Sequence, residues 1–287
     1  MDTIQHMIQL ALAEHEREDR TGENTTGAPV HYYWTDLLQK LDAPLEVFAA
    51  ALELIQSDKK IKRTVGVKVL SGMENKPPGI EKLAFTHIER FLKHETDTDV
   101  VSAVCESLYL FDSSRAIPLL AKMKNHPEPE VRRAVAIGLS GHEEHPDSVK
   151  LLLELTTDKA AIVREWATFY LGMTDDRSPE VCQALWERVD DEDSDVEGEA
   201  FKALTSRKDR RLRPMLLSML GDLNTVDTWM LDLAGWSKDP ELHESLQAIA
   251  AARLDDVHPD FATALHKALE YCKPATPESI SGSDNCG

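Results

Sequence analysis

The chain has 287 residues, a formal net charge of −19 at pH 7, and 42% hydrophobic but only 6% aromatic residues. The apolar share is that of a folded protein, and the length allows one or two domains with a sizeable core. The negative charge disfavours a general nucleic-acid binder and a protein of anionic membrane surfaces, because both need basic surfaces. It favours a basic protein partner, or solubility alone.

The first 42 residues precede any repeating pattern. Residues 2–18 have the spacing of an amphipathic helix, residues 20–29 (RTGENTTGAP) are polar, and residues 31–41 predict a further helix. We therefore expect capping helices and a polar loop over residues 1–42. The start of the chain lacks the basic segment of a secretory signal, and no apolar run reaches membrane-spanning length, so we expect a cytoplasmic protein that does not bind membranes.

From residue 43 onwards, a helical pattern recurs about every 32 residues. Apolar residues at positions 0, 4 and 8 of each repeat lie on one face of a helix. The residues at position 0 are Ile61, Val100, Val131, Val163, Val196 and Val226. A helix with its own apolar face precedes each of these helices, and one such pair is too small to bury both faces. We therefore predict about seven stacked helical pairs over residues 43–272.

The segments VRRAVAIGLS (131–140) and VREWATFYLG (163–172) display the repeat most clearly. Their Val-Arg-x-x-Ala-x-x-x-Leu-Gly pattern and the repeat length resemble HEAT-like repeats, particularly the short bacterial type also found in bilin-lyase-like proteins. The resemblance implies an all-α fold, a right-handed α-solenoid (superhelix) of stacked helical hairpins. We expect the arginine at position 1, Arg132 or Arg164, to tie one repeat to the next through carboxylates or helix-end carbonyls.

The end of the chain and the cysteines carry little further signal. Residues 273–287 contain few apolar residues and several Pro, Ser and Gly, so we expect a disordered tail. The cysteines, at 105, 182, 272 and 286, are widely spaced and form no CxxC pair. This spacing indicates free thiols of a reducing compartment rather than a disulfide framework or a zinc site.

No segment carries a recognisable catalytic or metal-binding pattern. The acidic stretch DDEDSDVEGE (190–199) lacks the glycine and glutamate that an EF-hand loop needs, and is better explained as a turn leading into a helix N-terminus. HEEHP (142–146) lacks zincin spacing and is expected to be a solvated loop. The basic clusters at 59–63 and 207–213 are expected to be solvated turns. We predict no catalytic residue, metal or cofactor, and an enzyme is the less favoured reading.

If the solenoid binds a partner, its second helices should present the site, because they line the concave surface in solenoids of this type. Helical geometry points positions 2 and 6 away from the core and places position 3 at the edge. The candidate partner-binding residues at these positions are Arg133, Ile137, Glu165, Trp166, Phe169, Lys202, Trp229 and Asp232. Alternatively, the two tryptophans at position 3 pack against the neighbouring repeat and are never exposed to solvent.

The sequence thus favours a non-enzymatic scaffold or adaptor that binds a partner protein, possibly a basic one, on its concave face. An immunity or inhibitor protein against a basic toxin is a special case of this hypothesis. The alternative is a bilin-lyase-like enzyme or chaperone that holds a small molecule, which a sharp pocket with aromatic residues would favour. A third reading, a HEAT-like DNA-lesion-binding protein, requires a contiguous basic groove, and binding to nucleic acid is not expected.

Overall fold

The computed structural model of the chain describes residues 3–21, 41, 43–72, 79–253 and 258–274. All regular secondary structure in these residues is helical, as predicted. None of the described helices is both long enough and apolar enough to cross a membrane. The second predicted capping helix and the predicted disordered tail fall almost entirely outside the described residues, and the domain limits at residues 42 and 272 stay predictions.

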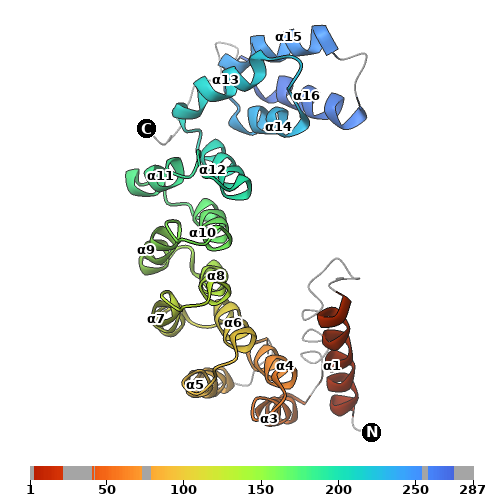
Figure 1. Cartoon of the computed structure of the whole chain (residues 1–287), viewed down its shortest axis with the longest axis vertical. Helices are drawn as coiled ribbons and strands as arrows, with labels where there is room; N and C mark the ends of the chain where they lie inside the picture. The colour runs from red at the N-terminus through yellow and green to blue at the C-terminus, as the bar shows by residue number, and fades with distance from the viewer. Residues whose placement is uncertain (1–2, 22–40, 42, 73–78, 254–257, 275–287) are drawn as a thin grey trace. The chain divides into compact units, whose positions relative to one another are not determined.

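The chain forms two compact units, residues 1–167 and 168–287. In unit 1, the helices after α1 form two rows, with α3, α5, α7 and α9 in one row and α4, α6 and α8 in the other (Figure 1). In the second row α4 packs on α6 and α6 packs on α8, whereas α1 packs on α4. The helices of this part are α1 (Thr3–Thr21), α3 (Pro44–Leu54), α4 (Lys60–Ser71), α5 (Ile80–Leu92), α6 (Thr98–Ser107), η1 (Leu108–Leu110), α7 (Ser113–Met123), α8 (Pro129–Gly138), η2 (Ser140–His142), α9 (Pro146–Leu155) and α10 (Ala161–Met173), which runs across the unit boundary.

Unit 2 continues the same arrangement of paired helices. Here α12 packs on α14 and α14 on α16, while α13 packs on α15. The elements are α11 (Pro179–Trp186), α12 (Ser194–Ser206), η3 (Arg210–Leu212), α13 (Arg213–Gly221), α14 (Thr228–Ser237), η4 (Pro240–Leu242), α15 (His243–Arg253) and α16 (Pro259–Tyr271).

The helices begin where the sequence supplies start signals. Proline occupies the first turn of α3, α8, α9, α11 and α16, where its missing N–H removes no helical hydrogen bond. Aspartate caps α6, α12 and α14 by accepting from backbone N–H groups of the first turn. The cap of α12 is Asp193, so the acidic stretch at 190–199 leads into a helix N-terminus, as predicted.

The apolar positions of the repeat form the core. Positions 0, 4 and 8 are fully buried in the repeat of α8 (Val131, Val135 and the C-cap Leu139) and in that of α6. Close packing of α6 on α8 depends on Gly138, because a Cβ at this position would collide with the backbone carbonyl of Cys105. The sequence pattern therefore sets both the buried face and the points where neighbouring helices approach most closely.

Arg132 joins two repeats as predicted. Its Nε and Nη2 donate to Asp158 at 2.6 and 2.8 Å, and Nη1 donates to the carbonyl oxygens of His126 and Pro127 at 2.7 and 2.9 Å. Burial alone would raise the pKa of the Asp158 carboxyl, but hydrogen bonds from Arg132 and the Ala160 N–H outweigh burial and lower it. The pair is thus held in its charged form between the start of α8 and the turn before α10.

The same contact occurs in the first repeat, and there it corrects the predicted register. Arg63 donates to Glu95 at 2.6 and 3.2 Å and to the carbonyls five and six residues before it, as Arg132 and Arg164 do. Arg63 therefore occupies position 1, so position 0 falls at residue 62 and the prediction of Ile61 is one residue off. The apolar pattern placed position 0 at Ile61, which is half-buried. A pattern of apolar residues does not include arginines, so it could not show that Arg63 occupies position 1.

Two segments expected to be solvated turns are partly buried. His142 is 4% exposed, with Nε2 3.2 Å from the Leu108 carbonyl oxygen and Nδ1 2.9 Å from Ser113 Oγ, so the prediction of a solvated loop is wrong at this residue. Arg207, 2% exposed, donates to the carbonyl oxygens of Leu171 and Gly172 at 3.0 and 2.8 Å. In both cases a polar side chain forms hydrogen bonds with carbonyl oxygens at a helix end. These hydrogen bonds hold the side chain in the interior, away from solvent.

The cysteine prediction holds only in part. Cys105 and Cys272 are buried free thiols, and burial raises the pKa of Cys105 to about 12. Cys182 is disulfide-bonded, which contradicts the expectation of free thiols at this position. Cys286 lies outside the described residues.

Candidate partner-binding site

A groove of about 390 Å³ runs over the second-row helices of unit 1. We call it the α4–α6–α8 groove, and its lining residues are Lys60, Ile61, Thr64, Lys68, Asp99, Ser102, Ala103, Glu106, Glu130 and Arg133. With the corrected register, Thr64 and Lys68 occupy positions 2 and 6 of α4, and Ser102 and Glu106 occupy the same positions of α6. The positions predicted to face away from the core thus line a groove built by three successive repeats.

Arg133 is the central charged residue of the groove, and carboxylates hold it in place. Its Nη2 donates to Glu106 and its Nε to Glu130, both at 2.9 Å, and its guanidinium carbon lies 5.8 Å from the centre of the Trp166 ring. These contacts connect α6, α8 and α10. They fix the guanidinium over the tryptophan rather than leaving it as an isolated cation.

The groove carries equal numbers of acidic and basic side chains. Three are cationic and three are anionic, and Lys60 pairs with Asp99 at 2.6 Å. Despite the net charge of −19, this surface is therefore locally balanced. A ligand that matches it would present polar groups of both kinds, as a polypeptide segment does.

Ser102 has an unsatisfied hydroxyl on the floor of the groove. The residue is 7% exposed, and its Oγ is buried with no hydrogen-bond partner among the described residues. A buried hydroxyl without a partner is costly and is rare in native structures. The neighbouring Thr64 is also buried, at 6% exposed.

The predicted residues of unit 1 lie on α8 and α10, and only one of them lines the groove. Arg133 does so, while Ile137, Glu165 and Trp166 are half-buried on the same two helices. Trp166 contacts Arg133 of the preceding repeat but is only half-buried, so the contact with a neighbour that the alternative expected is present, while exclusion from solvent is not. Ser102, Glu106 and Lys68 were not among the candidates. Ser102 and Glu106 stand at positions 2 and 6 in the predicted register, and Lys68 stands at position 6 only in the corrected one.

The predicted residues of unit 2 are distributed over three helices. Phe169 of α10 is 36% exposed, Lys202 of α12 is exposed and pairs with Glu199 at 2.8 Å, and Asp232 of α14 is half-buried. Trp229 of α14 packs edge-on against the buried Phe201 of α12, with ring centres 5.8 Å apart. Both tryptophans at position 3 thus contact the preceding repeat and remain partly accessible.

The stacked helical pairs and the groove built from their second helices define an α-helical repeat protein. A family model for HEAT repeats matches residues 85–172 and 118–204. The segment 85–204 therefore matches HEAT repeats, as the sequence pattern predicted, and the described residues have the all-α fold of stacked helical pairs.

The comparisons also identify a bacterial relative. Protein YibA of Escherichia coli, in strains K12 and O157:H7, is 30% identical over 112 residues, which is 39% of this chain and 39% of YibA. The crystal structure of E. coli YibA aligns over 93% of this chain and 95% of that chain, with a TM-score of 0.65 and 20% identity. An engineered protein aligns over 84% of this chain with a TM-score of 0.48 and 17% identity. The aligned sequence spans well under half of YibA, and the structural likeness concerns the fold alone.

Proposed function

We propose that this protein is a non-enzymatic scaffold that binds a partner protein through the outward positions of its second helices, with the α4–α6–α8 groove as the principal site in unit 1. The observation that carries the proposal is the buried, unpartnered Ser102 hydroxyl on the groove floor. A partner that donates or accepts one hydrogen bond there would remove an existing cost. HEAT repeats are a fold whose common use is protein interaction.

The composition of the groove suits a polypeptide better than an apolar small molecule. Only two of its lining residues, Ile61 and Ala103, are apolar, and none is aromatic, whereas small-molecule sites are lined mostly by apolar and aromatic side chains. Trp166 does not line the groove, but it lies under Arg133 and is an aromatic residue of the kind that protein interfaces favour. The bilin-lyase-like alternative therefore gains no support from this surface.

A basic partner is the finer form of the proposal, and an immunity or inhibitor protein against a basic toxin is one instance of it. Its support is the net charge of −19, together with Glu106 and Glu130, which now share the single cation Arg133. A lysine or arginine of a partner could take the place of Arg133 beside these carboxylates. Arg133→Gln should then strengthen capture of a basic partner, and added salt should weaken capture.

The proposal is tested by capture from lysate of the source organism, followed by hydrogen exchange on the purified complex. We expect added protection at α4, α6 and α8. Ser102→Ala should weaken binding about tenfold without loss of helical circular dichroism, because it removes a hydroxyl that has no partner in the free protein. Trp166→Ala combined with Phe169→Ala should abolish capture.

Trp236→Ala is the matched control, because Trp236 is 47% exposed on α14 and belongs to none of the predicted positions. It should capture the same partners as the wild type. The proposal would be overturned if the Ser102→Ala variant and the double aromatic variant both still captured the partner. The same holds if hydrogen-exchange protection in the complex appeared only outside α4, α6 and α8.

A further inference from the structure

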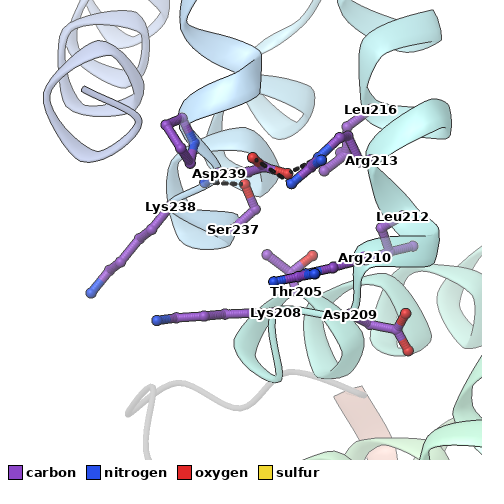
Figure 2. A pocket seen from close by; sticks show the side chains of 11 residues that line it. Thr205, Lys208, Asp209, Arg210, Leu212, Arg213, Leu216, Ser237, Lys238 and Asp239 are labelled. Atoms are coloured by element: carbon purple, nitrogen blue, oxygen red, sulfur yellow. Dashed lines mark hydrogen bonds and ion pairs between the residues drawn. The ribbon is translucent and has the colours of Figure 1, made fainter. Parts of the chain in front are cut away.

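A second concave site lies in unit 2, at the turns that end α12 and α14. It has a volume of about 280 Å³ (Figure 2). Its lining residues are Thr205, Lys208, Asp209, Arg210, Leu212, Arg213, Leu216, Ser237, Lys238, Asp239 and Pro240. It includes part of the basic cluster 207–213, which the scaffold function does not use. We call it the turn pocket.

Two lysines of the turn pocket occupy an unusual backbone conformation. Lys208 and Lys238 have φ values of 55° and 50°, and they are the non-glycine residues with positive φ in the described part of the chain. They follow α12 and α14 at equivalent places, 30 residues apart, where a helix usually ends in glycine. A lysine in this conformation costs free energy that glycine avoids, and both strained lysines line the same pocket.

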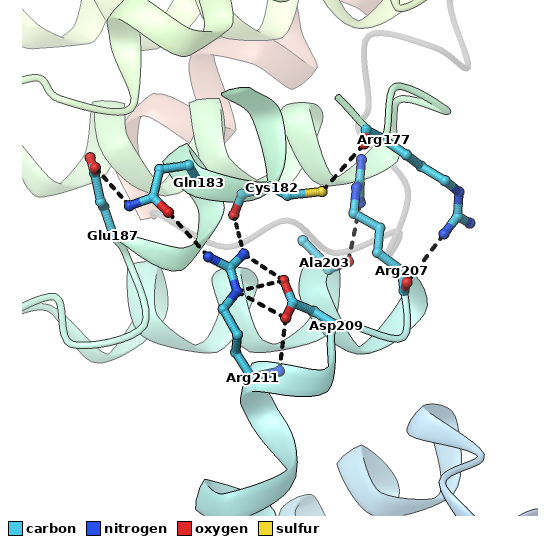
Figure 3. A network of polar contacts seen from close by, with 8 residues as sticks. All are labelled: Arg177, Cys182, Gln183, Glu187, Ala203, Arg207, Asp209 and Arg211. Atoms are coloured by element: carbon cyan, nitrogen blue, oxygen red, sulfur yellow. Dashed lines mark hydrogen bonds and ion pairs between the residues drawn. The ribbon is translucent and has the colours of Figure 1, made fainter. Parts of the chain in front are cut away.

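The carboxylates of the turn pocket are already neutralised. Asp209 accepts from Arg211 at 2.6, 3.0 and 3.1 Å, and Arg211 is itself held by Gln183 at 3.1 Å (Figure 3). Asp239 accepts from Arg213 at 2.6 and 3.1 Å (Figure 2). Neither aspartate is therefore available to balance the remaining cations.

Three cations remain at this site without a carboxylate. Lys208, Arg210 and Lys238 are exposed, and none has an ion-pair partner among the described residues. Within the described part of the chain, the only charge-related contact of Lys238 is with the Tyr271 ring, whose centre lies 5.9 Å from Nζ. In a chain with 51 acidic and 32 basic residues, three unpaired cations around one cavity are a marked local excess.

A buried hydroxyl points to a ligand independently of these charges. Thr205 is 1% exposed, lines the turn pocket, and has an Oγ1 with no hydrogen-bond partner among the described residues. Figure 2 places Thr205 beside Arg210, between Ser237 and Lys208. A donor in this position suits an oxygen-rich anion.

We propose that the turn pocket binds a small molecule bearing a phosphoryl group, held by Lys208, Arg210 and Lys238 and by the Thr205 hydroxyl. A phosphoryl dianion has several acceptor oxygens, which match one guanidinium, two ammonium groups and one hydroxyl. The volume leaves room for a small organic part and not for a polymer. A nucleic-acid duplex would require a row of cations along a surface, whereas these three line one cavity.

The test is calorimetric titration of the full-length chain with inorganic phosphate and, in a separate arm, with glycerol 3-phosphate. We expect both to bind, the ester at least as tightly as free phosphate. Lys208→Gln and Lys238→Gln should each weaken binding about tenfold. The matched control is Lys267→Gln on α16, which changes the net charge equally outside the pocket and should leave binding unchanged.

Two further variants separate binding from folding. Lys208→Gly removes the charge but relieves the backbone strain, so the melting temperature should stay the same or rise while phosphate binding weakens about tenfold, as in Lys208→Gln. Thr205→Val should keep the fold and weaken binding, because the hydroxyl has no partner in the free protein. Three results would each overturn the proposal. The first is an absence of phosphate binding in the wild type, and the second is a loss of phosphate affinity in Lys267→Gln as large as that in Lys208→Gln. The third result is binding of duplex DNA for which the ester does not compete.

Discussion

Replacing Arg132 with methionine tests whether charged contacts between repeats stabilise unit 1. The side chain is 5% exposed and that of Asp158 11% exposed, so removing the guanidinium leaves a buried carboxylate and two carbonyls without their partner. Breaking a buried ion pair from one side costs about 3–5 kcal/mol. The neighbouring Arg133 is a matched control, because its carboxylate partners are 29% and 57% exposed and its loss should cost about 1 kcal/mol or less.

Urea unfolding followed by circular dichroism, with hydrogen exchange to locate the loss, measures both variants. The lost stability should concentrate in α8, α9 and the start of α10, because each repeat contacts only its neighbours. In the folded state the pKa of Asp158 is below its ordinary value of 3.8, so the pair's contribution is complete above that pH and disappears as pH falls through the folded value. The penalty of Arg132→Met should shrink over the same range. Equal penalties for the two arginines, or one that does not depend on pH, would refute the reasoning.

Three other positions give sharp expectations. Gly138→Ala should destabilise the protein by about 2–3 kcal/mol in thermal unfolding, because its Cβ would meet the Cys105 carbonyl, whereas Gly198→Ala, with open space around its Cβ, should stabilise α12 by up to about 1 kcal/mol. Burial lowers the pKa of His142 below 6.5, so the unfolded chain takes up the proton first and stability should fall as pH drops below 6.5. His142→Gln should flatten that dependence between pH 7 and 5, and an unchanged pH profile would contradict the assignment.

The fold could be predicted from the sequence because burial alone determines which residues occupy the repeated apolar positions. Val131, Val135 and Leu139 recur at a spacing that only a helix turns into one face, and no other interaction competes at those positions. The first repeat failed by one residue because Ile61 offers a plausible apolar anchor, while the true marker of the register is Arg63. An arginine at position 1 also recurs at Arg132 and Arg164, but a register assigned from apolar residues alone does not use it.

The candidate site was predictable only as a set of outward positions. Helical geometry places Arg133 on that face, but it does not reveal that Glu106 and Glu130 would hold its guanidinium over Trp166. Nor can a sequence show that the Ser102 hydroxyl would be left without a partner, since this depends on which neighbours come within hydrogen-bonding distance. Contacts between repeats thus decide which outward residues are engaged and which are available.

In the basic cluster 207–213, the residues that stabilise the turn must be distinguished from those that can bind a ligand before the function of the cluster is tested. Arg207, Arg211 and Arg213 are all engaged, by helix-end carbonyls, by Asp209 and by Asp239 respectively, and their loss would leave buried polar groups unsatisfied. Only Lys208 and Arg210 carry charge that no described group uses. Neutralising the whole cluster would therefore unfold the turn and abolish any binding for a trivial reason. Substituting Lys208 alone distinguishes the two effects, because glycine at a φ of 55° preserves the turn while removing the charge.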